Sequence, residues 1–251
     1  MDIALVVLAS AFAGFVDALV GGGGLILVPA LFSVFPQAAP ATLFGTNKAA
    51  AIWGTAWATV QYARRVTLDW PLLVPAAVAA LIGGVTGAWA VTRVSAEVFR
   101  QALPFVLLAV FLYTIARPDM GTVHAPRLSP ARARAVAIAI GFLLGCYDGI
   151  FGPGTGSFLV FLFVRLLGYD FLHASASAKL LNTATNGAAL ALFAATGHVW
   201  WGIALAMAVA NVAGSLAGTR LALARGSGFV RRVFIFVVAA LILRTAWDAF
   251  G

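Results

Sequence analysis

Charged residues are scarce in this sequence. Only 10% of its 251 residues are Asp, Glu, Lys or Arg, and 63% are hydrophobic, whereas a soluble domain has about 25% charged and about 45–50% apolar residues. So little polar surface cannot keep so much apolar chain in water, which excludes a soluble enzyme, a disordered protein and a secreted scaffold. The composition therefore predicts a protein of the lipid bilayer.

Cysteine and histidine are almost absent. The single Cys146 has no partner for an intramolecular disulfide. His124, His173 and His198 are scattered along the chain without the spacing of a metal site, and no Ser, His or Cys set with catalytic partners is visible. We therefore expect no metal and no cofactor, and an integral membrane enzyme is only an alternative.

The formal net charge of +8 does not indicate nucleic acid as a partner. The basic residues lie at the ends of apolar segments and not on a face with interleaved aromatic residues. Cytoplasmic loops of membrane proteins collect Lys and Arg in this way. The first apolar run has no basic region before it and no small-residue cleavage site, so we expect it to be retained.

Ten apolar segments divide into two sets of five. They cover 3–20, 25–36, 41–62, 70–92 and 98–116, and then 134–151, 156–168, 172–195, 199–222 and 229–247. A full membrane span needs about 20 residues, so the second segment of each set is too short and is predicted to be re-entrant or part of a broken helix. The polar stretch 117–133 is predicted to be a cytoplasmic linker between a first repeat, 1–116, and a second, 134–251.

A single offset of 131 residues superposes the two sets. Asp17 falls on Asp148, and Lys48 falls on Lys179, although these are the only two lysines of the chain. Several glycine pairs keep the same register: Gly14 with Gly145, Gly21 with Gly152, Gly23 with Gly154, Gly83 with Gly214 and Gly87 with Gly218. The register indicates an internal duplication.

Charge predicts how the two repeats are oriented. The loop with Arg64 and Arg65 corresponds to 195–198, which has no Lys or Arg, so equivalent loops are expected on opposite sides of the membrane. We place three basic loops in the cytoplasm: 63–69, 117–133 and 223–232. Each half then crosses an odd number of times. The predicted fold is an all-α polytopic membrane protein of two inverted-topology repeats, each of about five segments with a glycine-broken first pair, as in secondary transporters.

The glycine breaks are the first candidate binding elements. They read GFVDALVGGGGLILVP and GCYDGIFGPGTGSFLV, and free amides where a helix restarts favour an anion. The alternative is that these glycines only permit close helix packing, which is our expectation for Gly83, Gly87, Gly214 and Gly218. The candidate anion-binding residues of the two breaks are Gly22, Gly23, Gly24, Gly152, Gly154, Thr155, Gly156 and Ser157.

Asp17 and Asp148 are the only acids inside the apolar segments. A charge at the bilayer centre costs at least about 2.5–3.5 kcal/mol, so such groups pair or face a cavity. We expect Lys48 and Lys179 to bind the anion and the two aspartates to carry protons. The alternatives are lysines that reach to the membrane interface and aspartates that cap the glycine turns.

Amide side chains complete the predicted site. Asn182 and Asn186 follow Lys179 at steps of three and four and share its helical face. Thr46 and Asn47 directly precede Lys48 and are included as candidates. Asn211 either lines the same site or joins two helices through its amide.

Four motifs together carry a family resemblance. GFVDALVGGGGLILVPAL, TNKAA, YDGIFGPGTGSF and ASAKLLNTATN resemble the TauE/SafE sulfite exporter (TSUP) family, in its YfcA-like branch. The resemblance implies a bacterial inner-membrane permease of two homologous halves, driven by protons and acting on sulfite, sulfonates or other small organic anions. Its partners would be the anion, protons and membrane lipids. A passive anion channel and a non-transporting scaffold are further alternatives, and the oligomeric state is left open.

Overall fold

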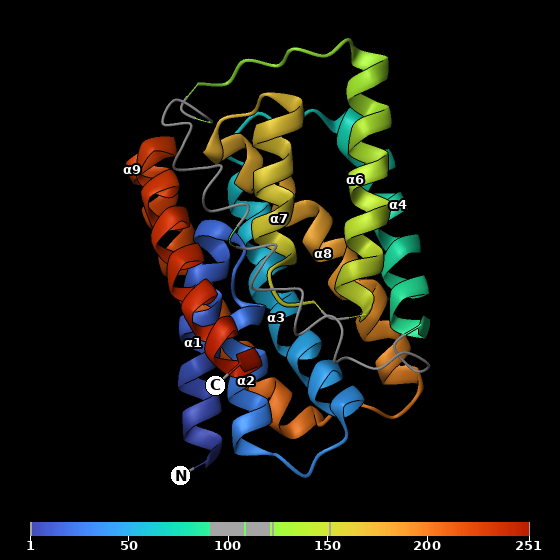
Figure 1. Cartoon of the computed structure of the whole chain (residues 1–251), viewed down its shortest axis with the longest axis vertical. Coiled ribbons are helices and arrows are strands. Elements are labelled where there is room, and N and C mark those ends of the chain that lie inside the picture. The colour runs from blue at the N-terminus through green and yellow to red at the C-terminus, as the bar shows by residue number, and fades with distance from the viewer. Residues whose placement is uncertain (1, 91–107, 109–120, 122, 151, 251) are drawn as a thin grey trace.

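The computed structural model describes residues 2–90, 108, 121, 123–150 and 152–250. Every regular element in this part of the chain is a helix, which confirms the predicted all-α class (Figure 1). In chain order the elements are α1 (Asp2–Val20), α2 (Gly24–Val34), α3 (Pro40–Ala63), α4 (Trp70–Ala90), α6 (Pro130–Ile150), α7 (Thr155–Leu162), the π-helix η1 (Phe163–Leu167), α8 (Phe171–Ala195) and α9 (Trp201–Phe250).

The helices follow the apolar segments with few differences. The short predicted segment 25–36 forms the short helix α2, and the short segment 156–168 forms α7 and η1. Helix α6 begins at Pro130, inside the stretch predicted as linker, because proline is well tolerated in the first turn of a helix. The last two segments form α9, which is interrupted at Gly226, where φ is +70°. The predicted segment 98–116 lies outside the described residues, apart from Leu108.

Glycine turns end the first helix of each repeat. Gly21 (φ +79°) follows α1, and Gly152 (φ +84°) follows α6 at the equivalent position of the second repeat. Only glycine adopts this left-handed backbone at little cost. Helix α2 restarts at Gly24, and α7 restarts at Thr155 after Gly154 (φ +86°). The two breaks therefore follow from the glycines that the sequence analysis identified.

The distribution of polarity is that of a membrane protein. Large apolar side chains of the outer helices are exposed, such as Leu8 on α1, Ile82 on α4, Leu143 on α6 and Val209 on α9, whereas the lysines and most of the amides are buried. In the described part of the chain, four helices are long and apolar enough to cross a bilayer: α1, α4, α6 and the first 37 residues of α9. An apolar exterior around a polar interior suits lipid as solvent. The chain is a multi-pass membrane protein.

The outer helices form two pairs on either side of a central group. Helix α1 packs against α9, and α4 packs against α6, while α3, α7 and α8 lie between them (Figure 1). Small residues allow the close contacts, because a Cβ on Gly83 would overlap the carbonyl of Phe142 and one on Gly214 would overlap the carbonyl of Ala11. The 131-residue offset converts one of these contacts into the other. The packing role expected for these scattered glycines is confirmed, and the inverted orientation of the repeats stays a prediction.

Candidate functional site

A small polar cavity lies where the glycine breaks meet the central helices. It encloses about 30 Å³, enough space for a water molecule. Its lining comes from both repeats and includes both aspartates, one lysine and four asparagines. The lining residues are Ala13, Asp17, Gly21, Gly23, Gly24, Leu27, Asn47, Lys48, Ala51, Thr55, Asp148, Gly152, Gly156, Asn182, Asn186 and Asn211.

A buried ion pair joins α3 to α6 at this cavity. Lys48 Nζ lies 2.6 Å from Asp148 Oδ2, and the two side chains are 4% and 2% exposed. Charges removed from water so fully are held only when they are paired. Lys48 belongs to the first repeat and Asp148 to the second. This ion pair therefore holds the two repeats together at the cavity.

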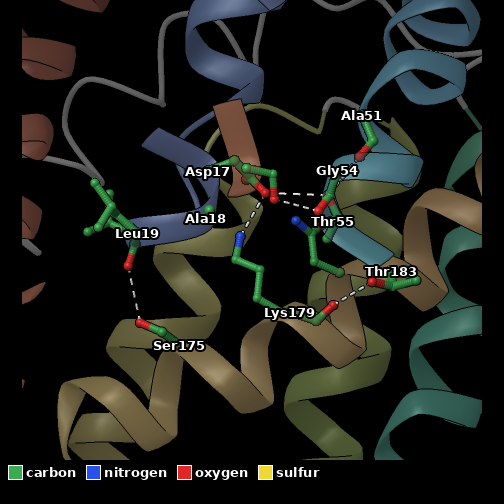
Figure 2. A network of polar contacts seen from close by, with 12 residues as sticks. Asp17, Ala18, Leu19, Ala51, Gly54, Thr55, Ser175, Lys179 and Thr183 are labelled. Carbon is green, nitrogen blue, oxygen red and sulfur yellow. Dashed lines mark hydrogen bonds and ion pairs between the residues drawn. The ribbon is translucent and has the colours of Figure 1, made fainter. Parts of the chain in front are cut away.

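A second ion pair joins α8 to α1. Lys179 Nζ donates to Asp17 Oδ2 at 2.7 Å, and the lysine side chain is 0% exposed while that of Asp17 is 14% exposed. Figure 2 shows Lys179 extending from α8 to Asp17, with Thr55 of α3 on the same carboxylate at 3.3 Å. Ser175, one turn earlier on α8, donates to the Leu19 carbonyl at 3.3 Å (Figure 2). Asp17 is thus the more open of the two carboxylates.

The 131-residue offset between the repeats maps one ion pair onto the other. Lys48 and Lys179 are equivalent, as are Asp17 and Asp148, yet each lysine pairs with the aspartate of the other repeat. Both lysines are buried and paired, so they do not extend toward a membrane surface. The aspartates bind lysines and do not cap the glycine turns. Among the alternatives that the sequence left open for these four side chains, the structure therefore shows charge pairing.

Amide groups supply the remaining polarity of the cavity. Asn47 Oδ1 is buried without a hydrogen-bond partner among the described residues, and an unsatisfied buried acceptor costs about 1–3 kcal/mol. Asn182 and Asn186 interact only weakly, at 3.5 Å. Asn211 Nδ2 donates to the Ser10 carbonyl at 3.0 Å and also lines the cavity, so it fulfils both roles that the sequence left open. These amides can donate to an anion or accept from a protonated one.

Several predicted site residues lie beside the cavity and stabilise its walls. Thr46 Oγ1 accepts from the Trp200 amide at 3.1 Å, Thr155 Oγ1 donates to the Gly152 carbonyl at 2.7 Å, and Ser157 Oγ donates to the Val20 carbonyl at 3.0 Å. Gly22, Gly154 and Lys179 are also absent from the cavity lining. Thr55 and Gly21 line the cavity without being among the predicted site residues, although Thr55 shares the helical face of Lys48 and Gly21 belongs to the four-glycine run.

The start of α7 is already engaged by protein carbonyls. The amide of Ser157 donates to the Gly21 carbonyl at 3.1 Å, and the amide of Thr155 donates to the Gly152 carbonyl at 3.2 Å. An anion would have to displace these bonds to bind at the start of α7. In the described conformation, the cavity asparagines are therefore less engaged than the α7 amides, whereas the lysines are paired with the aspartates.

The two glycine breaks touch each other backbone to backbone. A Cβ on Gly21 would overlap the backbone of Gly156, and Gly21 also has the left-handed φ of +79°. We expect Gly21→Ala to destabilise the protein by about 2–5 kcal/mol, from left-handed strain and overpacking together. Thermal unfolding in detergent measures the effect.

Gly202→Ala is the matched control for this prediction. Gly202 lies in the first turn of α9, and a Cβ added to it would have no heavy atom within 4 Å, so alanine should be neutral or slightly stabilising. Equal effects of the two substitutions would contradict the close contact of the breaks.

Comparisons with known proteins agree over almost the whole chain. The family profile described as "Sulfite exporter TauE/SafE" matches residues 6–245. "Probable membrane transporter protein ORF9" of Sinorhizobium sp is 36% identical, with 98% of this chain and 93% of the relative covered. "Probable membrane transporter protein YfcA" of Escherichia coli K12 is 34% identical over 95% of this chain and 87% of the relative. A "Probable membrane transporter protein" of Haemophilus influenzae is 31% identical over 99% and 98%. No solved structure matches.

Proposed function

This chain belongs to the TauE/SafE sulfite exporter family, as its motifs predicted, and on that premise we propose that it is a proton-coupled secondary transporter of small anions. The substrate class is sulfite, sulfonates or similar sulfur-containing or organic anions. The membrane is the bacterial inner membrane, with 117–133 on the cytoplasmic side. The observation that carries the proposal is the pair of buried lysine–aspartate contacts that cross between the repeats at one cavity.

Charge balance at the cavity explains why an anion would travel with protons. Each lysine is neutralised by an aspartate, so the four side chains together have no net charge to offer an anion. An anion that binds Lys48 must displace Asp148. The displaced carboxylate would then be buried and unpaired, at a cost of about 3–5 kcal/mol, unless it takes up a proton. Anion binding and proton uptake are thereby coupled.

The amides give the anion its hydrogen bonds. Asn182 and Asn186 lie on the face of α8 that carries Lys179, and Asn47 is adjacent to Lys48 in α3. The unpartnered Oδ1 of Asn47 would gain a partner from a water molecule or from the proton of a singly protonated anion. A site made of one lysine, two aspartates and several amides suits a small oxyanion better than an apolar solute.

Flux into proteoliposomes tests the proposed function. Radiolabelled sulfite is offered with and without an imposed pH gradient, with thiosulfate, sulfate and small sulfonates as competitors. We expect saturable uptake that the gradient drives and that one or more of these anions inhibit. Uptake that ignores the gradient would indicate a passive channel, and no flux of any tested anion would remove sulfur oxyanions as the substrate class.

Asp17→Asn should uncouple transport from protons. The amide cannot release or accept the proton, while Lys179 keeps its charge for the anion. We expect sulfite uptake by this variant, measured per folded protein, to be about the same with and without the pH gradient. Asp69→Asn makes the same chemical change at an exposed loop residue and should keep the full stimulation. Retained stimulation in Asp17→Asn would show that this carboxylate carries no proton.

A further inference from the structure

A second cluster of polar side chains lies outside the cavity, at the start of α8. It consists of His124 from the segment before α6, together with Asp170 and His173 at the first turn of α8. One nitrogen or oxygen ligand atom from each residue lies within 4.8 Å of the other two. The two imidazole rings lie with their centroids 4.1 Å apart and their planes tilted by 33°. Three side chains with metal-binding chemistry therefore converge from two separate segments.

Asp170 is the centre of this cluster. Its Oδ2 lies 2.7 Å from His173 Nδ1, and its Oδ1 accepts from the His173 amide at 2.8 Å and from Ser227 Oγ at 2.9 Å. Burial disfavours the charged carboxylate, but the hydrogen bonds from His173 and Ser227 outweigh this and hold the pKa of Asp170 below its usual value. Asp170 is thus ionised at neutral pH and fixed in place by its neighbours.

Helix capping accounts for only part of the cluster. Asp170 is the N-cap of α8, and its bond to the His173 amide is an ordinary capping contact. Capping gives no reason for His124. This exposed imidazole contacts the rings of His173 and Tyr169 and makes no hydrogen bond within the described residues. Its two ring nitrogens are therefore available to a ligand beside a fixed carboxylate and a second imidazole.

We propose that His124, Asp170 and His173 form a binding site for one divalent transition-metal ion, best matched by Zn²⁺. Two imidazole nitrogens and one carboxylate oxygen form a common zinc ligand set, with water in a fourth position. Calcium and magnesium prefer oxygen ligands throughout, so the imidazoles favour a transition metal.

Zinc binding requires small shifts of the three side chains. Zinc bonds of about 2.0–2.1 Å in a tetrahedron place the ligand atoms roughly 3.4 Å apart. The present set lies within 4.8 Å and would close slightly, while His173 Nδ1 and Asp170 Oδ2, now 2.7 Å apart, would separate slightly. Without metal, His173 Nδ1 and Asp170 Oδ2 bond to each other, and zinc would replace this contact with a bond to each of the two atoms. His124, which is exposed and held by ring contacts alone, is the ligand with most freedom to move.

The bound ion would join two parts of the chain directly and a third through Asp170. His124 lies in the segment between the repeats, which already meets the start of α8 through the bond from the Ala125 amide to the Gly168 carbonyl at 2.9 Å. Ser227 follows the Gly226 break of α9, donates to the Asp170 carboxylate and accepts from the Leu172 amide at the same helix start. Zinc would therefore stabilise the junction of the linker with α8 and α9.

Zinc binding is tested on the whole chain purified in detergent without a polyhistidine tag. After equilibration with micromolar ZnCl₂ and gel filtration, we expect about one zinc per chain by elemental analysis, and a higher melting temperature with zinc than with a chelator. His124→Ala should lower zinc affinity at least about tenfold and abolish the thermal shift. Asp170→Asn should do the same, although asparagine keeps the helix cap.

His198→Ala is the matched control, because His198 bonds Thr196 at the end of α8 and lies outside the cluster. It should bind zinc as the original chain does. The proposal is overturned if the chain retains no zinc, or if His124→Ala and His198→Ala retain it equally. Cobalt substitution gives an independent readout, since visible absorption of a tetrahedral Co²⁺ site should appear in the original chain and be lost in His124→Ala. None of these measurements depends on transport.

Discussion

Asp148→Asn is expected to destabilise the folded protein by about 3–5 kcal/mol, because it leaves Lys48 buried without its counter-ion. Lys48 is 3% exposed and its Nζ lies 2.6 Å from Asp148. Lys48→Met, which keeps most of the side-chain volume, should cost a similar amount by leaving Asp148 unpaired. The double variant should recover part of the loss, since it leaves no unpaired buried charge. Unfolding titrations in mild detergent give the free energies of all four proteins.

A second double-mutant cycle tests which aspartate is the partner. Lys48→Met combined with Asp17→Asn should show clearly weaker coupling, because Asp17 is held by Lys179 and Thr55. The reverse cycle, Lys179→Met with Asp17→Asn, should couple as strongly as Lys48 with Asp148. Stronger coupling within a repeat than between repeats would contradict the crossed ion pairs.

The double variant Lys48→Met with Asp148→Asn should also lose anion uptake by roughly 10²-fold. Truncating one partner of a desolvated charge contact costs about 2–5 kcal/mol, and the double variant removes the cation at the cavity without leaving an unpaired charge. Because this protein is expected to fold, loss of flux would report on the Lys48–Asp148 pair at the cavity and not on misfolding. Uptake of radiolabelled sulfite per folded protein is the measurement.

Arg64→Ala provides the control for removal of a positive charge. Arg64 is exposed after the end of α3, so its loss should leave uptake within about twofold, given the small energies of exposed charges. If the double variant transports sulfite as well as Arg64→Ala does, Lys48 is not part of the anion site.

Much of the fold could be predicted because its causes are local. The apolar segment 41–62 corresponds to α3 (Pro40–Ala63), and 172–195 corresponds to α8 (Phe171–Ala195). Glycines with positive φ end the first helix of each repeat where the sequence has glycine runs. The start of α6 at Pro130 was missed, since polar residues in a first helical turn resemble a loop when only hydropathy is considered.

The candidate site was predicted in part. The cavity is lined by Asp17, Asp148, Lys48, Asn182 and Asn186, because polar residues within membrane segments face the protein interior or a cavity. The hydroxyls of Thr155 and Ser157 were assigned to the anion but bond to backbone carbonyls. Their motif does not reveal this, since the carbonyl that Ser157 contacts belongs to Val20, in the other repeat.

The sequence by itself determined that this protein lies in lipid, that its two halves correspond, and which family it belongs to. Composition decides whether a chain is stable in water or in lipid, and the constant offset of 131 residues between the two halves is visible without a structure. Only the tertiary structure decided that each lysine pairs with the aspartate of the other repeat, and that His124 meets Asp170 and His173. These pairings depend on which helices pack together. Helix packing is set by side-chain contacts between segments far apart in the chain, which no local pattern records.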